Sequence, residues 1–273
     1  MSGTEPAARR GGAPQIDCHA HIFTRDMPFA ASAHSRPGYE YPVEAFLSDL
    51  AKHGLTHGVI AAASLFGDYN DYTLECLAAH PNLRATIILE PDTPLATIRA
   101  VSMKGVVGVR LVWRRLESLP DVRSDPWRSF FRHLAECGLH VELLAGGARL
   151  PELLPAILEQ GVDVVLDHFG VPPQENGGDD AGTDAMLRAV AKGRTWVKLS
   201  AGFRIPAEVT ARCTERLLAE GGPGRLLWGS DAPFINHEDT SDYPGALAYY
   251  HSLVPDPATR AMIDETARKL FFE

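Results

Sequence analysis

The residues best suited to catalysis or metal binding are His19 and His21 in the segment QIDCHAHIF, which are separated by a single alanine. Side chains two positions apart on a β-strand share a face, so both imidazoles are expected to enter one cavity. Imidazoles paired in this way suit metal binding or polarisation of a carbonyl group. By the same alternation Asp17 lies one step deeper, where it could orient a ring, and Cys18 points away from that face.

Two further titratable side chains end other apolar segments. His168 ends VVLDH, and Asp231 ends LLWGSD, where Gly229 leaves room in the interior. A carboxylate among imidazoles can act as a general base or as a metal ligand. The less favoured alternatives are a helix N-cap before proline for Asp231 and a hydrogen-bonded core position for His168. We predict a catalytic set of four residues: His19, His21, His168 and Asp231.

Several arginines occur where they could hold a substrate carboxylate. Arg110 lies in VGVRLVW, Arg114 and Arg115 follow it, and Arg204 ends VKLSAGFR. Guanidinium groups bind carboxylates with two parallel hydrogen bonds. Arg114 and Arg115 also suit a solvated loop, and Asn70 suits a turn as well as a binding site. We predict that substrate contacts come from Arg110, Arg204, Arg115 and Asn70.

The overall charge narrows the choice of partner. The 273 residues carry a net charge of −9, from 26 Lys and Arg against 35 Asp and Glu. Such a surface repels phosphate backbones, which argues against nucleic acid, whereas arginines at strand ends predict a small anionic substrate. The apolar runs are far shorter than the roughly 18 residues of a membrane span. The four cysteines are scattered, as is typical of free thiols in the cytoplasm, and a homo-oligomer is possible.

Eight short apolar segments provide strands that could position these side chains. They cover residues 15–22, 56–63, 83–90, 106–113, 139–145, 162–168, 195–201 and 225–231. Amphipathic segments, such as 43–52, 125–137 and 207–219, lie between them. Eight strand and helix units in about 250 residues predict an α/β fold, a single-domain (β/α)8 TIM barrel over residues 15–273. A doubly wound sheet is the alternative, but no G-x-G-x-x-G follows the first segment.

The segments outside these units also carry predictions. Residues 1–14 have no apolar stretch of the kind found in secretory signals, so we expect a flexible tail. The loops 24–42 and 171–184 follow strand ends and would overhang the face where TIM barrels hold their active sites. The second loop suits either a lid or a mobile surface excursion.

Taken together, the motifs resemble those of the amidohydrolase superfamily. They are QIDCHAHIF, SLFGDYNDYTLECL, VGVRLVW, LDHFG, VKLSAGFR and WGSDAPF, and they spread over residues 15–234. They are similar to the amidohydrolase-2 branch, above all to the 2-pyrone-4,6-dicarboxylate lactonases and related lactonases. This resemblance implies a (β/α)8 barrel and hydrolysis of a small carboxylated lactone.

Two departures from the superfamily concern metal binding. Arg110 stands where many members carry a carboxylated lysine that bridges two metals, and Leu144 stands where metal-binding members commonly have a histidine. The lactonase branch resembles this pattern, and the resemblance implies catalysis without a metal. We therefore favour no cofactor, with a single divalent ion such as zinc, held by the catalytic set, as the alternative.

The predicted activity is the opening of a carboxylated lactone or related cyclic ester by water. Asp231 would accept a proton from the water, the three imidazoles would stabilise the oxyanion, and the arginines would hold the substrate carboxylates. Two alternatives stay open: a metal-dependent decarboxylase of the same branch, and a non-catalytic binder of small carboxylates.

Overall fold

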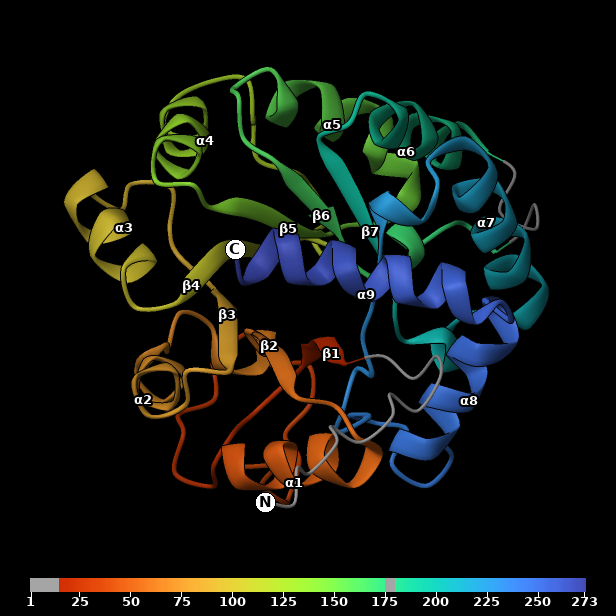
Figure 1. The fold of residues 1–273 in the computed structure, drawn as a ribbon. Helices are drawn as coiled ribbons and strands as arrows, with labels where there is room; N and C mark the ends of the chain where they lie inside the picture. Colours follow the sequence, from red (N-terminus) through yellow and green to blue (C-terminus); the bar gives the residue numbers. More distant parts are fainter. Residues whose placement is uncertain (1–14, 175–179) are drawn as a thin grey trace, which may run out of the picture.

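Eight parallel strands form a barrel with helices around it in the computed structural model, which describes residues 15–174 and 180–273 (Figure 1). The sheet order follows the chain from β1 to β8. The strands are β1 (Ile16–Ala20), β2 (His57–Ala61), β3 (Leu83–Ile87), β4 (Val106–Val112), β5 (His140–Leu144), β6 (Val164–Leu166), β7 (Thr195–Leu199) and β8 (Leu226–Trp228). This confirms the predicted single-domain (β/α)8 barrel.

Backbone hydrogen bonds between the first and last strand regions close the barrel. The His21 amide donates to the Ala232 carbonyl and the Asp231 amide donates to the His19 carbonyl, each at 2.8 Å. Gly229 lies at this seam, where a Cβ would come within 2.4 Å of the His19 Cβ. The glycine therefore allows close approach of two strands that carry catalytic candidates.

The helices cover the outer face of the barrel. They are α1 (Val43–His53), α2 (Asp71–Ala79), α3 (Leu95–Ser102), α4 (Trp127–Glu136), α5 (Leu150–Leu158), α6 (Ala181–Ala191), α7 (Ala207–Glu220), α8 (Tyr243–Leu253) and α9 (Pro257–Phe271). The apolar faces of α1 to α8 pack on outward-facing strand residues in one large core. Within the described residues, no helix is both long and apolar enough to cross a membrane.

Helix α9 lies across one end of the barrel (Figure 1). Its Ala267 and Phe271 pack against inward-facing strand residues, which we call the lower layer: Ile16, Cys18, Val59, Val165 and Leu227. All of these side chains are buried. The end of the barrel nearest the strand N-termini is thus closed by apolar packing among the described residues.

A β-bulge in β1 changes the predicted alternation of its side chains. Asp17 pairs with Gly58 but Ala20 pairs with Ile60, so three steps along β1 match two along β2. Cys18 therefore points into the lower layer, and Asp17 points outward to the Tyr243 hydroxyl at 2.8 Å. The predictions that Cys18 faces away and that Asp17 orients an imidazole are both wrong. The alternation is interrupted between Asp17 and Ala20, so His19 no longer shares a face with Asp17.

The predicted overhanging loops are only partly described. Residues 1–14, predicted as a tail, and 175–179, within the predicted lid, lie outside the described residues. The loop after β1 is tied to the loop after β8: the Tyr39 hydroxyl donates to Glu238 at 2.7 Å, and the Ser35 hydroxyl to Asn236 at 2.8 Å. These bonds hold the loop 24–42 at the barrel mouth.

Candidate active site

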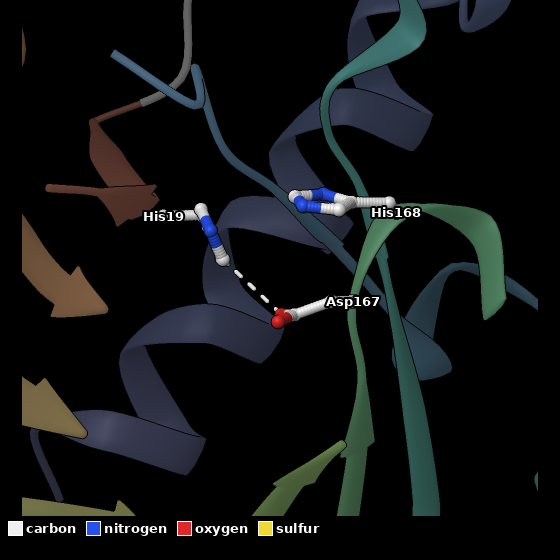
Figure 2. Close-up of side chains that lie close together, drawn as sticks. All are labelled: His19, Asp167 and His168. Carbon is white, nitrogen blue, oxygen red and sulfur yellow. Dashed lines mark ion pairs between the residues drawn. The ribbon is translucent and has the colours of Figure 1, made fainter. Parts of the chain in front are cut away.

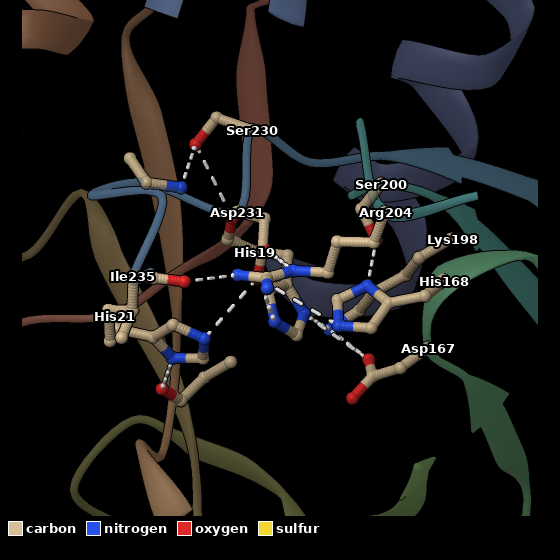
Figure 3. A network of polar contacts seen from close by, with 12 residues as sticks. His19, His21, Asp167, His168, Lys198, Ser200, Arg204, Ser230, Asp231 and Ile235 are labelled. Atoms are coloured by element: carbon tan, nitrogen blue, oxygen red, sulfur yellow. Dashed lines mark hydrogen bonds and ion pairs between the residues drawn. The ribbon is translucent and has the colours of Figure 1, made fainter. Parts of the chain in front are cut away.

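The four residues of the predicted catalytic set converge at the mouth of the barrel (Figure 3). Asp231 Oδ1 lies 3.4 Å from His21 Nε2, 3.5 Å from His19 Nε2 and 3.8 Å from His168 Nε2. All four side chains are at least nine-tenths buried. Three imidazoles from two strand ends thus surround one carboxylate oxygen.

Unusual backbone conformations aim two of these side chains. His168 has φ 51° and Asp231 has φ 63°, both in the left-handed region that side chains other than glycine rarely adopt. Each residue comes just after a strand, β6 or β8, where a normal turn would carry its side chain elsewhere. Such strain persists only where the surroundings enforce it, and it concentrates at functional sites.

The surrounding imidazoles keep Asp231 ionised. Burial alone would raise the pKa of the Asp231 carboxyl, but His168, His21 and His19 outweigh burial and hold this pKa well below its usual range. Arg204 adds a charged partner, because its Nε donates to Asp231 Oδ2 at 3.1 Å. The carboxylate is therefore available as a proton acceptor even at mildly acidic pH.

Second partners orient the outer two imidazoles. His21 Nδ1 lies 2.8 Å from the Ala61 carbonyl oxygen, which can only accept, so Nδ1 carries a proton. His168 Nδ1 lies 2.8 Å from the Ser200 hydroxyl. Burial lowers the pKa of His168 to about 4, so its ring is neutral at neutral pH. Both Nε2 atoms consequently face Asp231.

A layer of four buried charges lies beneath His19, and the sequence pattern alone does not reveal it. This charged layer consists of Arg110, Glu142, Asp167 and Lys198, all at most 3% exposed. Lys198 Nζ lies 2.5 Å from Glu142, and Arg110 donates to Asp167 Oδ2 at 2.9 Å and lies 3.0 Å from Glu142. Two cations and two anions compensate each other without solvent, as buried charges require.

His19 lies between the charged layer and the Asp231 carboxylate. Figure 2 shows His19 beside Asp167, with Nδ1 3.2 Å from Asp167 Oδ1, and His168 close by. Burial lowers the pKa of the His19 imidazole well below its usual range, although the Asp167 carboxylate opposes this. The pKa of Asp167 in turn is well below its usual value, because His19, Arg110 and Lys198 outweigh its burial.

The mouth of the site is a cavity of about 350 Å³ with positive charge around it. Arg114, Arg115 and Arg204 line it together with His34. Burial and the neighbouring Arg115 and Arg204 lower the pKa of Arg114, which shows that like charges are crowded here. The predicted positions of Arg115 and Arg204 at the site agree with this geometry, although Arg204 also donates to the Ile235 carbonyl at 2.9 Å.

Two predicted substrate contacts have other partners. Arg110 does line the cavity, but its donors are largely used by Asp167 and the Ala62 carbonyl, which leaves its contact with a substrate a prediction. Asn70 exchanges two hydrogen bonds with the backbone of Ile88, at 2.9 and 3.3 Å, and is not among the described residues that line the cavity. Asn70 thus joins α2 to the end of β3, because its amide matches a backbone group in shape.

The spacing of the catalytic set is compatible with one divalent ion. Ligands at about 2.0–2.1 Å from a tetrahedral ion lie about 3.3–3.4 Å apart, close to the separations around Asp231. His19, His21 and Asp231 form one potential ligand group, and His19, Asp167 and His168 form another. His21 also has the proton on Nδ1 that metal-bound histidines usually have, which leaves the Nε2 lone pair for an ion.

A model of the Amidohydrolase family matches residues 16–272 of this chain. Among characterised relatives, the chain is 22% identical over 235 residues to 4-sulfomuconolactone hydrolase of Hydrogenophaga intermedia, which covers 84% of this chain and 77% of that protein. It is 25% identical over 251 residues to 2-pyrone-4,6-dicarboxylate hydrolase of Comamonas testosteroni, with 85% and 81% covered.

The chain is also similar to solved structures of hydrolases of this kind. A probable 2-pyrone-4,6-dicarboxylic acid hydrolase of Acinetobacter baumannii with citric acid bound has a TM-score of 0.90 at 29% identity and covers 94% of this chain and 99% of its own. A candidate 2-pyrone-4,6-dicarboxylic acid hydrolase of Pseudomonas putida has a TM-score of 0.87 at 34% identity, with 95% and 97% covered. An amidohydrolase of Burkholderia multivorans with bound zinc shares the fold at 18% identity, with a TM-score of 0.78 and 95% and 99% covered.

Proposed function

Because this chain belongs to the amidohydrolase family, we propose that it hydrolyses a small lactone bearing one or more carboxylates. The observation that carries the proposal is a buried Asp231 carboxyl with one oxygen 3.4–3.8 Å from three imidazoles, in a cavity lined by arginines. The relatives named for hydrolysis of 2-pyrone-4,6-dicarboxylate and 4-sulfomuconolactone support this substrate class.

Asp231 is the proposed general base. A water molecule beside it gives a proton to the carboxylate while its oxygen bonds to the lactone carbonyl carbon. The carbonyl oxygen becomes an oxyanion, and N–H groups of His19 and His168 stabilise it. The ring C–O bond then breaks, and the leaving oxygen takes the proton back from Asp231. The product is an open-chain hydroxy acid, and the enzyme returns to its starting state.

His21 has a different proposed role from the other two imidazoles. Its Nδ1 proton is used by the Ala61 carbonyl, so neutral His21 has no proton on Nε2 to give to an oxyanion. It lies beside Asp231 instead, with Nε2 3.4 Å from Oδ1, and is the imidazole of the set that would share an ion with the carboxylate.

Arg204 and Arg115 are the proposed contacts for the substrate carboxylates. Both line the cavity, and Arg204 reaches Asp231 with Nε alone, which leaves N–H groups for a ligand. An anionic group in this cavity relieves the repulsion among the crowded arginines. Orientation by such contacts places the carbonyl carbon beside the water, which is a large part of the catalytic effect in enzymes of this kind.

A divalent ion such as zinc, if bound, would be held by the catalytic set and would supply Lewis-acid polarisation of the carbonyl oxygen. We favour catalysis by the side chains alone, because Arg110 and Leu144 occupy positions from which a metal would otherwise gain ligands. The Arg110 guanidinium, with Nη2 3.5 Å from His19 Nε2, also adds positive charge where the ion would lie.

The test is turnover of 2-pyrone-4,6-dicarboxylate in ¹⁸O-enriched water, with mass spectrometry of the product. Hydrolysis incorporates one solvent oxygen into a new carboxylate and keeps every carbon atom. Loss of carbon dioxide would identify a decarboxylase instead. A rise in melting temperature without consumption of any carboxylated lactone in a panel would identify a non-catalytic binder and contradict the proposal. The dimethyl ester of the same pyrone is the matched neutral substrate.

A further inference from the structure

Lys198 lies beneath His19, where it contacts one of the two ring nitrogens of the imidazole. It comes from β7, is completely buried, and its Nζ lies 3.1 Å from His19 Nδ1 in hydrogen-bonding geometry. The other neighbours of Nζ are Glu142 Oε2 at 2.5 Å and Asp167 Oδ1 at 3.4 Å. An ammonium group has three donors and no acceptor, so the contact with Nδ1 can only be a donation to it.

Two acceptors and two donors compete for the His19 ring. Asp167 Oδ1 is 3.2 Å from Nδ1, but it accepts no hydrogen bond within the part of the chain that the structure describes. Asp167 is thus close to Nδ1 without the geometry of a hydrogen bond, whereas Lys198 has that geometry, so Lys198 is the hydrogen-bond partner of Nδ1. At Nε2, Arg110 Nη2 is 3.5 Å away, at the limit of a hydrogen bond, and already donates to Asp167 at 2.9 Å.

A neutral imidazole has one acceptor nitrogen and one N–H. If Nδ1 accepts from Lys198, the proton lies on Nε2, where Asp231 Oδ1 at 3.5 Å is the available acceptor. The neighbouring His21 has the opposite arrangement, because the Ala61 carbonyl requires the proton on Nδ1. The two histidines of one H-x-H motif are thus held in different tautomers by their second partners.

We infer that Lys198 is a positioning residue that fixes His19 as the Nε2–H tautomer, which makes His19 a hydrogen-bond donor at the site and disqualifies it as a metal ligand. A metal-bound histidine normally donates its other N–H to a carboxylate or carbonyl. His21 meets that condition, and His19 would meet it through Asp167 only if Lys198 were absent. The role of the Nε2 proton in stabilising an oxyanion rests on the proposed function, but the tautomer itself does not.

The first measurement is the tautomer of His19 in the neutral ring. Two-dimensional ¹H–¹⁵N spectra of ¹⁵N-histidine-labelled protein distinguish the two ring nitrogens, and a His19→Gln variant assigns the signals. In the wild-type chain we expect the proton of His19 on Nε2 and that of His21 on Nδ1. In Lys198→Met, Asp167 is the remaining partner at Nδ1, and we expect the proton to move there.

The second measurement is zinc binding by the purified protein in competition with a chelating dye. Second partners of metal ligands typically change affinity by about 10- to 100-fold, so we expect Lys198→Met to bind zinc tighter by that factor. Lys198→Met leaves one cation, Arg110, for the two carboxylates of the charged layer. The double variant Lys198→Met/Glu142→Gln removes one charge of each sign and keeps the layer balanced. The exposed Lys192→Met is the matched control and should bind zinc as the wild type does.

Two results would overturn the inference. One is a His19 Nδ1–H tautomer in the wild-type protein. The other is unchanged or weaker zinc binding in both Lys198 variants, each shown to be folded by circular dichroism. Neither measurement uses a substrate, so a chain without lactonase activity would contradict the proposed function while leaving the tautomer result to be judged separately.

Discussion

The two halves of the barrel interior are built on opposite principles. The lower layer is apolar and closed by Ala267 and Phe271 of α9. Above it, the charged layer and the catalytic set contain ionised and imidazole groups that are equally buried. The lower half gains stability from burial in proportion to apolar area, whereas the upper half loses free energy to desolvation and recovers it by pairing.

Along the barrel axis, the lower half therefore contributes mainly to stability and the upper half mainly to function. Substitutions in the lower half should act through packing alone and leave the rate constants unchanged. Substitutions in the upper half should alter charge balance, orientation and rate together. The predictions below test this division, beginning with the largest effect.

Replacing Asp231 with Asn should abolish most activity while the fold remains. Loss of a general base typically lowers the rate by about 10²- to 10⁴-fold. Steady-state kinetics with a carboxylated lactone, together with circular dichroism, would measure the effect. The exposed Asp239→Asn is the matched control. A folded Asp231→Asn variant with nearly wild-type kinetics would exclude Asp231 as the base.

Replacing Arg110 with Met should strongly destabilise the protein. The change leaves Glu142 and Asp167 with one cation between them, and breaking a buried ion pair in this way costs about 3–5 kcal/mol. Urea denaturation would measure it. The control is Arg99→Met, which removes an exposed pair with Glu136 and should cost less than about 1 kcal/mol. Equal losses in the two variants would show that the buried layer has no special energetic role.

Replacing Arg204 with Met should weaken catalysis selectively for charged substrates. Hydrogen bonds to charged groups are worth about 1.5–3 kcal/mol, or roughly 10- to 150-fold in kcat/KM. The loss should be much smaller for a neutral ester analogue of the same lactone. Because Arg204 also contacts Asp231, part of the loss will be common to both substrates. Identical losses for the two would mean that Arg204 only supports the catalytic carboxylate.

Replacing His140 with Gln should reduce the sensitivity of stability to acid. His140 is buried near α9, and burial lowers its pKa to about 3, below its usual value near 6.5. The unfolded chain takes up this proton as pH falls through 6.5, but the folded chain does not, so stability is lost below that pH. Between pH 7 and 5 this costs about 2 kcal/mol, which the variant should not lose. Urea titrations of both proteins at the two pH values would measure this difference in unfolding free energy. If the wild type and the variant lose the same stability between pH 7 and 5, His140 is not the group responsible.

Much of the architecture was predictable from local pattern. Apolar segments located all eight strands, because parallel strands buried on both faces are apolar throughout. The observed strands are shorter than the predicted segments, since the hydrogen bonding between strands ends where residues such as His168 and Asp231 leave the sheet. The catalytic set also followed from strand-end positions, and the structure brings all four residues together, although their roles stay predictions.

Part of the charged layer was predictable from the sequence. Glu142 and Lys198 are single charges inside otherwise apolar strands, in HVELL and TWVKL, and a buried charge requires an opposite partner. What the sequence could not supply was the pairing itself. The bulge in β1 was also invisible, because nothing local marks the interruption that separates Asp17 from His19.

The balance of the charged layer restricts how this enzyme can change over generations. A lower-layer residue such as Val165 can be changed by single methyl or methylene groups, each step costing about 0.5–1.5 kcal/mol. Lys198 and Glu142 cannot be replaced in this gradual way, because either single replacement leaves the buried layer with an uncompensated charge. Exchange there must pass through paired substitutions, whose energies are strongly non-additive. Descendants of this chain should therefore diverge readily beneath the layer and change within it only by coordinated steps.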